Sequence, residues 1–358
     1  MLNLSNYIVG TCPHMCPIKE TKMRENQRLL HIFEVVPGTE RDELPKADLN
    51  RVVKSFSRSA AGKNLTDPEI LRPVSILLET VNYLLDDIIN NESDWLLKYN
   101  FIMDRLRSVR QDMVIQNISR AHQIVILQPI IRFHAYAAYR SCEEHINEFD
   151  PHINNIHLQE CLKRLLCMYD YYDHLEITTK SNSGFSSDFL EENRPYFETL
   201  YLIFNIGDVD AINRTLSIPK HWRTDLLVTG LKMSLSYVAG NYFKVCKLLQ
   251  TMPLTIQMIM YLHMPKLRRL CLKTMDVAYN SKNLSYPKII LTKLLLYNSE
   301  DELESDCKHY GLKFNEEGIC FLKDFQQDAK KVKSRRSSEI DKILLDLDLS
   351  TLLLFGDI

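Results

Sequence analysis

Two short stretches, Ile206-Gly207-Asp208 and Ala239-Gly240-Asn241, lie 33 residues apart in a chain of 358 residues. Each glycine follows a segment rich in leucine and tyrosine and precedes a second segment that ends at a proline, Pro219 or Pro253. Glycine permits a tight turn between helices, and proline ends a helix because it lacks the backbone N–H. A period of about 33 to 34 residues is typical of helix–turn–helix repeats and predicts a stack of helix pairs. Two copies are also compatible with two ordinary helical hairpins.

The composition favours a helical protein without a uniform charge. Ten glycines and 13 prolines are few for this length, whereas dinucleotide-binding and β-rich folds need more glycine in their turns. The 44 Lys and Arg residues against 46 Asp and Glu residues leave a formal net charge of −2. This balance excludes a nucleic-acid coat that is basic throughout, so any basic surface must be local.

The sequence carries no signal for secretion or membrane insertion. Its nine cysteines are odd in number and scattered, which is typical of reduced thiols in the cytosol or nucleus rather than of a disulfide framework. Residues 1–10 lack the basic and apolar regions of a signal peptide. The most apolar window, Gln123–Tyr139, contains Arg132 and is too short to span a bilayer. We therefore expect a protein of the nucleus and cytoplasm with no membrane partner.

Helical periodicity dominates the N-terminal half. Residues 18–34 are polar and free of glycine and proline, which predicts a helix, and residues 35–48 predict a loop. Asp67 can cap a second helix that begins at Pro68 and kinks at Pro73. Apolar residues recur three and four positions apart and predict two buried helix faces. These faces consist of Ile70, Val74, Leu77, Val81, Leu84 and Ile88, and of Ile102, Leu106, Val109 and Met113.

The segment 286–325 has the element order of a winged helix. Pro287–Tyr297 and Glu300–Tyr310 predict two helices, and the runs 312–315 and 319–322 flank a turn with glycine, which predicts a β-hairpin. With the repeats, these features predict an all-α helical repeat stack that ends in a small winged helix with a short β-hairpin. The predicted division is a helical region at 1–150, the repeat stack at 151–285, the winged helix at 286–325, and a flexible basic linker with a leucine-rich acidic tail at 326–358.

No motif predicts an enzyme, a cofactor or a small-molecule substrate. The Gly-x-Ser-x-Gly, His-Glu-x-x-His and Rossmann patterns do not occur. The stretch Ala61-Gly62-Lys63-Asn64 lacks the upstream glycine of a phosphate loop and the hydroxyl that would bind magnesium. Cys12 and Cys16, with His14 between them, form one pair of ligands where a structural zinc site normally has two. We therefore expect no metal and interpret this proline-rich leader as a buried structural segment.

Basic residues gather in one strip between Tyr261 and Lys293. This range contains seven cations and a single acid, Asp276. Such a strip can neutralise RNA phosphates without contacting the bases. The alternative interpretation is the solvated face of a repeat stack. The seven cations are Lys266, Arg268, Arg269, Lys273, Lys282, Lys288 and Lys293.

A second basic cluster lies in the polar segment after the winged helix. Its composition is typical of a nuclear localisation signal. Phosphorylation of the following Ser337 or Ser338 would cancel part of its charge. The cluster consists of Lys330, Lys331, Lys333, Arg335 and Arg336.

The second helix of the winged helix is acidic. In a winged helix that reads DNA, this helix enters the major groove, where its five acids would be repelled by the phosphates. We therefore expect it to bind a protein partner through Glu302, Glu304 and Asp306. The alternative is that these acids only keep an exposed helix soluble.

Several ordered motifs are distinctive as a set. They are Gly10-Thr11-Cys12-Pro13, Met15-Cys16-Pro17, Ser57-Arg58-Ser59-Ala60-Ala61-Gly62-Lys63, Leu71-Arg72-Pro73 and Asp104-Arg105-Leu106-Arg107-Ser108-Val109-Arg110-Gln111-Asp112. With these motifs the chain resembles the SAC/GANP family, the helical scaffolds of nuclear messenger-RNA export, over roughly residues 7–325.

The resemblance implies a stack of the TPR or PCI kind with a PCI-type winged helix, and a scaffold without enzymatic activity. It implies pairing with another PCI-domain protein and with a small acidic subunit. The chain is most similar to the short branch of the family, which is associated with centrosome duplication and the mitotic spindle, because it lacks the FG-repeat and centrin-binding extensions of the large members. Direct RNA binding through the basic strip is the alternative function.

Overall fold

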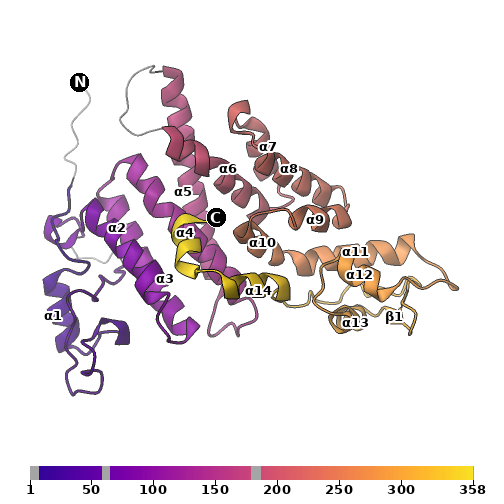
Figure 1. Ribbon diagram of the computed structural model, residues 1–358, viewed down its shortest axis with the longest axis horizontal. Coiled ribbons are helices and arrows are strands. Elements are labelled where there is room, and N and C mark those ends of the chain that lie inside the picture. Colours follow the sequence, from indigo (N-terminus) through magenta and orange to yellow (C-terminus); the bar gives the residue numbers. More distant parts are fainter. Residues whose placement is uncertain (1–7, 59–64, 179–186, 358) are drawn as a thin grey trace. The chain divides into compact units, whose positions relative to one another are not determined.

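The computed structural model describes residues 8–58, 65–178 and 187–357 and confirms the all-α prediction. The described chain contains fifteen α-helices and one two-stranded sheet (Figure 1). It divides into two compact units. Unit 1 comprises the chain up to Phe133 together with Asp348–Gly356, and unit 2 comprises His134–Leu347 with Asp357. None of the helices in the described ranges is long and apolar enough to cross a membrane.

Unit 1 contains helical elements from the N-terminal part of the chain and one short helix from its C-terminal part. Its elements are α1 (Ile18–Asn26), η1 (Ile32–Glu34), η2 (Pro68–Ile70), α2 (Val74–Tyr83), η3 (Leu84–Ile88), α3 (Trp95–Ile115), the first part of α4 (Arg120–Arg140) and α15 (Leu349–Phe355). The two predicted apolar faces are confirmed. Leu77 and Leu84 on one face, and Leu106 and Met113 on the other, are completely buried.

Two predicted helix boundaries in unit 1 are wrong. The first helix ends at Asn26 instead of residue 34, and Arg28 adopts a left-handed conformation with φ of 57° that an α-helix does not allow. Asp67 does accept a hydrogen bond from the Glu69 N–H at 3.0 Å, but it caps only a single 3₁₀ turn. The α-helix begins at Val74, directly after Pro73, so this proline precedes the helix rather than kinking it.

A buried carboxylate, Asp112 on α3, holds three separate segments of unit 1 together. It accepts hydrogen bonds from Lys54 Nζ and from Arg72 Nε, both at 2.7 Å, and all three side chains are nearly inaccessible to solvent. Arg72 also donates to Ser108 Oγ at 2.8 Å, and Lys54 donates to the Ile70 carbonyl at 2.7 Å. The ion pairs therefore join two irregular segments to the long helix α3.

Glu34 forms a second buried ionic centre. Its carboxylate pairs with Arg24 of α1 and with Arg105 of α3, the latter at 3.0 Å, and it accepts the backbone N–H of Val53 at 3.1 Å. Burial alone would raise the pKa of Glu34, but Arg105 and Arg24 stabilise the charged form and hold the pKa below its usual value. This centre fixes α1 and the irregular segment near Val53 against α3.

The proline-rich leader is part of this assembly. The Gly10 N–H donates to Gln116 Oε1 at 2.8 Å, and the Cys12 N–H donates to the Leu71 carbonyl at 3.0 Å. The Met15 carbonyl accepts the Lys54 N–H at 2.9 Å. Cys12 and Cys16 are both buried, as the sequence predicts for a structural segment. These contacts bring the leader into the core of unit 1.

Unit 2 contains the repeated helix pairs and the winged helix. Its elements are the rest of α4, α5 (Pro151–Thr178), α6 (Ser187–Phe204), α7 (Val209–Ser217), η4 (Lys220–Trp222), α8 (Asp225–Val238), α9 (Tyr242–Leu249), α10 (Leu254–Tyr261), α11 (Met264–Ala278), α12 (Lys288–Leu294), α13 (Glu300–His309), β1 (Lys313–Phe314), β2 (Ile319–Cys320) and α14 (Ser338–Asp346).

The repeat predicted from the two glycines is confirmed. Gly207 joins α6 to α7 with φ of 82°, and Gly240 joins α8 to α9 with φ of 74°, a left-handed region that favours glycine. A Cβ at Gly207 would lie 2.8 Å from the Tyr237 ring. Asp208 and Asn241 then cap the second helix of each pair through their side-chain oxygens. Both pairs therefore use the same turn chemistry.

The winged-helix order of two helices and a hairpin is also confirmed. β1 and β2 pair antiparallel, with Phe314 opposite Ile319, and Tyr286 forms a further bridge to Ile319. Leu303, Leu312 and Phe321 are buried beneath them. Residues 338–355, which lie within the predicted linker and leucine-rich acidic tail, form α14 and α15, and Ile340, Leu352 and Leu353 are buried.

We predict that Glu34→Gln lowers the free energy of unfolding at neutral pH by about 3–5 kcal/mol. The substitution removes the buried carboxylate that pairs with both Arg24 and Arg105, and it leaves them only Glu20, at 3.8 Å from Arg24, and Asp104. The folded pKa of Glu34 lies below its ordinary value of 4.5, so its stabilisation is present above pH 4.5 and is lost as the pH falls through the folded pKa. The difference between wild type and variant should therefore shrink in acid.

Chemical denaturation from pH 3 to pH 7 measures this effect. Glu69→Gln is the matched control, because Glu69 forms an exposed pair with Lys19 and its loss should hardly change the denaturation midpoint. Equal effects of the two substitutions, or a pH-independent effect of Glu34→Gln, would contradict the assignment.

Candidate interaction surfaces

The predicted basic strip does not present all seven cations to solvent. Arg268 on α11 is buried, and its guanidinium donates to Glu302 Oε1 at 3.0 Å and to the Leu295 carbonyl at 3.1 Å. It also lies 3.9 Å from the centre of the Tyr297 ring. The expectation that Arg268 faces RNA phosphates is therefore wrong, because its positive charge joins α11 to the winged helix.

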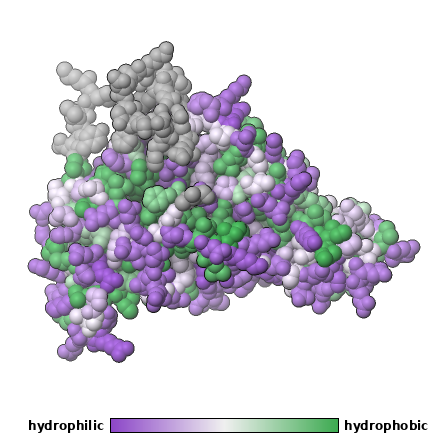
Figure 2. Space-filling view, in the orientation of Figure 1, coloured by the Kyte–Doolittle hydropathy of each residue, from purple (hydrophilic) through white to green (hydrophobic). Residues whose placement is uncertain are grey.

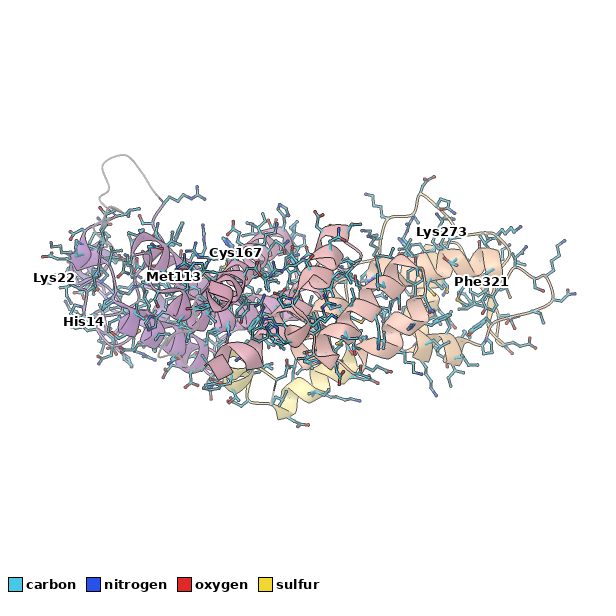
Figure 3. All side chains as sticks on the ribbon, turned by 90° about the horizontal axis from the view of Figure 1, so that it is seen from above. His14, Lys22, Met113, Cys167, Lys273 and Phe321 are labelled. Atoms are coloured by element: carbon cyan, nitrogen blue, oxygen red, sulfur yellow. The ribbon has the colours of Figure 1, made fainter. Side chains whose placement is uncertain are left out.

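Two other members of the strip are also engaged within unit 2. Lys288 pairs with Glu304 at 2.7 Å, and Arg269 donates to the Gln327 carbonyl at 2.6 Å. The acid of the strip, Asp276, is buried and accepts the backbone N–H groups of Lys323 and Phe325, both at 3.0 Å. The four remaining members have no acidic partner in the described chain; they are Lys266, Lys273, Lys282 and Lys293 (Figure 3 labels Lys273).

The acidic side chains of α13 are largely engaged as well. Asp306 is completely buried and accepts hydrogen bonds from Tyr297 Oη at 3.0 Å and from Arg335 at 2.9 Å. Burial and the nearby Asp306 raise the pKa of Tyr297, so its hydroxyl remains a donor. Glu302 pairs with Arg268 and Arg335. The prediction that these acids form one free face is therefore wrong for Asp306 and Glu302.

The exposed acids of α13 lie at its start. Glu300 and Asp301 in the first turn are exposed, and Glu304 is partly exposed beside Lys288. Hydrophilic side chains cover most of the face that Figure 2 shows, with smaller hydrophobic areas among them. On α12, Ile289 and Ile290 keep 54% and 45% of their surface, which gives this end of unit 2 an apolar as well as an acidic surface.

The basic cluster after the winged helix is divided by its contacts. Lys330, Lys331 and Lys333 are exposed. Arg335 pairs with Asp306 at 2.9 Å, and Arg336 pairs with Glu143 at 3.4 Å. The two arginines therefore fasten the segment before α14 to the rest of unit 2, which differs from a free linker.

The leader cysteines lie close to backbone acceptors. Cys12 Sγ donates to the His14 carbonyl at 3.2 Å, and burial raises the pKa of Cys16 to about 12. Within the described residues, no group of three or more His, Cys, Asp and Glu side chains is arranged to hold a metal ion.

The signature residues divide between core and surface. Arg105 and Asp112 belong to the buried ionic centres, Arg107 lies 4.0 Å from the centre of the Phe56 ring, and Gln111 donates to the Ser57 carbonyl at 2.8 Å. Arg58 is exposed. Gly62 and Lys63 lie outside the described residues, and Arg110, Pro13, Met15 and Pro17 complete the set around the leader and α3.

Sequence reasoning did not identify Glu34 and Lys54 as partners of these signature residues. Lys54 lies in a segment without helical periodicity, and Glu34 lies at the end of the predicted first helix. They are 58 and 71 positions from their partners Asp112 and Arg105 on α3. No local pattern signals such a pairing. One signal in the sequence is the number of charged residues on α3, which is larger than the solvent-exposed face of one helix needs. That excess could have indicated that some of these charges have buried partners.

The chain belongs to the SAC3/GANP family, since the model of that family matches residues 15–316. It is 27% identical over 329 residues to SAC3 family protein 1 of Schizosaccharomyces pombe, covering 86% of this chain and 30% of that protein. It is 28% identical over 356 residues to Protein xmas of Drosophila melanogaster, covering 95% and 16%. It is 29% identical over 276 residues to SAC3 family protein B of Arabidopsis thaliana, covering 73% and 15%. The chain thus spans less than a third of the length of these relatives.

Proposed function

We propose that this chain is a non-enzymatic scaffold related to nuclear messenger-RNA export complexes. Its membership of the SAC3/GANP family carries this proposal. Three buried thiols are consistent with this proposal. Burial raises the pKa of Cys16, Cys246 and Cys307 to about 12, which keeps them protonated and unreactive.

The scaffold would pair through its winged helix with another PCI-domain protein and would accept a small acidic subunit. The exposed acids Glu300 and Asp301 and the exposed apolar residues Ile289 and Ile290 support this surface. Apolar residues ringed by charge are the usual composition of a protein interface. Glu302 and Asp306 contribute indirectly, because their ion pairs hold α13 in place.

RNA binding is the second candidate function. Lys266, Lys273, Lys282 and Lys293 have no acidic partner in the described ranges, so their charge is available to phosphates. Such contacts would be independent of RNA sequence and sensitive to salt.

We predict that Glu300→Arg with Asp301→Arg reduces co-purification of a PCI-domain partner by about tenfold or more while the protein stays folded, because charge reversal at an interface opposes association. Co-purification from cells that express the tagged chain, quantified by mass spectrometry, measures this. Glu148→Arg, at an exposed acid elsewhere in unit 2, is the matched control. Full retention of the partner by the double variant would reject the surface.

For the RNA candidate, we predict that Lys266→Glu, Lys273→Glu and Lys282→Glu together weaken binding to a uridine oligonucleotide and flatten its salt dependence, because fewer counter-ions are released. Fluorescence anisotropy at several salt concentrations measures both quantities. Lys232→Glu, at an exposed position of α8, controls for net charge. Unchanged RNA affinity in the triple variant would exclude this strip.

The proposed localisation is the nucleus and cytoplasm in interphase and the centrosome and spindle in mitosis.

We predict that Lys330→Ala, Lys331→Ala and Lys333→Ala together reduce nuclear accumulation, because they remove positive charge from the proposed localisation signal. Thermal stability should not change, because these three side chains are exposed. Imaging of the tagged chain through the cell cycle measures this. An unchanged nuclear fraction would reject the import role, and absence from mitotic centrosomes and spindles would reject the mitotic role.

A further inference from the structure

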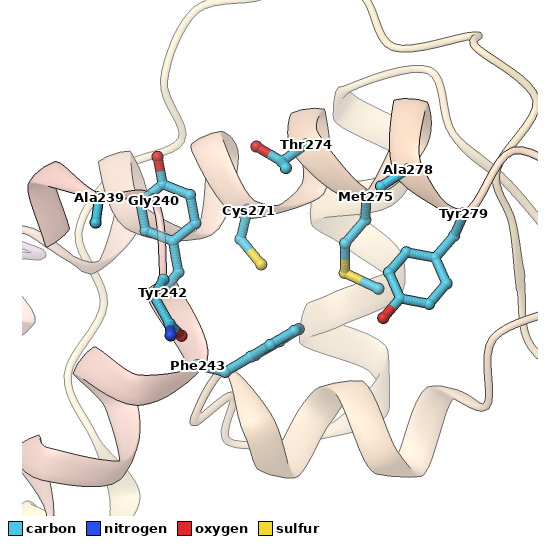
Figure 4. Close-up of a pocket in the computed structure, with 10 residues that line it drawn as sticks. Ala239, Gly240, Tyr242, Phe243, Cys271, Thr274, Met275, Ala278 and Tyr279 are labelled. Atoms are coloured by element: carbon cyan, nitrogen blue, oxygen red, sulfur yellow. The ribbon is translucent and has the colours of Figure 1, made fainter. Parts of the chain in front are cut away.

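Two apolar surfaces of unit 2 are left open by the described chain. One is a pocket of about 270 Å³ between α9 and α11 (Figure 4). Cys271 and Met275 form its floor, and the rings of Tyr242, Phe243 and Tyr279 surround it. Its lining contains no charged side chain, so it does not select one class of apolar ligand over another. The other surface is α14, whose apolar residues follow a defined spacing.

Only one of the nine side chains of α14, all of them within the described chain, is buried. Ile340 keeps 1% of its surface, whereas Ile343 keeps 46% and Leu345 keeps 84%. Leu347, which follows the helix directly, keeps 44%. Large apolar side chains are normally buried in a helix of this kind, since packing supplies most of its stability. Much of the apolar surface of α14 is therefore available to a partner.

Polar contacts hold the start of α14 but not its second half. Ser337 caps the helix by accepting the Ile340 N–H at 3.4 Å. Asp341 accepts a hydrogen bond from Tyr139 Oη at 2.9 Å and lies 3.6 Å from the Arg336 guanidinium. Beyond Asp341, no side chain of α14 forms a hydrogen bond or ion pair with the described residues. Weakly packed segments of this kind open at the lowest cost, so the helix can separate from unit 2.

The backbone changes conformation at the end of α14 in a way that aligns four apolar residues. Leu347 and Asp348 are extended, with ψ of 144° and 110°. Residues three and four positions apart share a face of a helix, so Ile340, Ile343 and Leu347 lie on one face. Residues two positions apart share a face of extended backbone, which adds Leu349. We call these four residues the apolar row.

The spacing of the apolar row is that of a leucine-rich nuclear export signal. Two, three and one residues separate its successive members, and acids occur among the residues between them. Segments of this class bind their export receptor as a short helix that continues into an extended stretch. Their apolar side chains enter an apolar groove, as in other complexes of an amphipathic helix with a groove. Sequence spacing and backbone conformation therefore indicate the same kind of partner.

We propose that residues 340–349 are a nuclear export signal and that their partner is the export receptor that binds leucine-rich signals. Ile343 and Leu347 contact the receptor first because they are already exposed, and Ile340 enters the groove when α14 separates from unit 2. The inference rests on the proposed localisation and deepens it. The basic cluster would carry the chain into the nucleus, and this segment would return it to the cytoplasm.

The first test measures binding of the purified full chain to the purified export receptor, with the small GTPase of nuclear transport in its GTP-bound form. We expect Ile343→Ala with Leu347→Ala to weaken binding by about tenfold or more, because two anchors of the apolar row are removed. Leu345→Ala is the matched control. It removes the most exposed leucine of the same helix but lies off the row, so it should weaken binding by less than about twofold.

The melting temperature of each variant should match that of the wild type, because the three substituted side chains keep at least 44% of their surface. The second test uses leptomycin, which blocks the groove of this receptor in cells. We expect the nuclear fraction of the tagged chain to rise about twofold or more, either with leptomycin or with Ile343→Ala and Leu347→Ala. Leptomycin should have no further effect on that double variant.

The proposal is overturned if the receptor does not bind the wild-type chain, or if it binds the double variant as tightly as the wild type. Equal weakening by Leu345→Ala would also overturn it, because the contact would then not depend on the apolar row. A chain that binds the receptor in solution but stays cytoplasmic in leptomycin would contradict nuclear import and would support the export signal. Failure of the proposed localisation and failure of this inference therefore give separate results.

Discussion

Carboxylates buried among arginine and lysine side chains determine which segments of this protein can meet. Asp112 and Glu34 have no exposed surface, so each must keep its cationic partners within hydrogen-bonding distance or lose much more energy than an exposed pair would. The partners include Arg24 of α1 and the side chains of Lys54 and Arg72, which lie in irregular segments. The path of the N-terminal region is thus set by charge as much as by apolar packing. An ion pair of this kind tolerates little displacement, which favours one arrangement of these segments over others.

Ion pairs also join separate helices at two places in unit 2. Arg214 pairs with Asp170 at 2.9 Å and with the buried Glu198 at 2.8 Å, which links α7 to α5 and α6. Arg268 pairs with Glu302, which links α11 to α13. These bonds cross between elements that are distant in sequence. The orientation of the winged helix on the last repeat helix therefore depends on ion pairs and their backbone acceptors as well as on the apolar core around Leu303 and Phe321.

The parts of the fold that could be predicted from sequence are those set by local chemistry. Helical periodicity identified the buried faces of α2 and α3, and the positions of Gly207 and Gly240 identified the repeated turn, because both features act within a few residues. Buried charge is different. A sequence gives no sign that Arg268 or Asp306 is paired, since the partner of Arg268 lies 34 positions away and is chosen by the folded chain. The charge that the candidate surfaces on α11 and α13 present to solvent was overestimated for that reason.

The ion pairs inside unit 2 also show which positive charges are left to contact a binding partner. Once the cations that hold unit 2 together are set aside, the lysines without an acidic partner in the described chain include Lys244 on α9 and Lys266 and Lys273 on α11. These two helices also form the pocket with the Cys271 and Met275 floor. Exposed lysines that form no ion pair add little to the stability of the folded chain. The ion pairs inside unit 2 therefore restrict its free positive charge to a few positions, and a binding partner can form new contacts at those positions without breaking the pairs that hold the helices together.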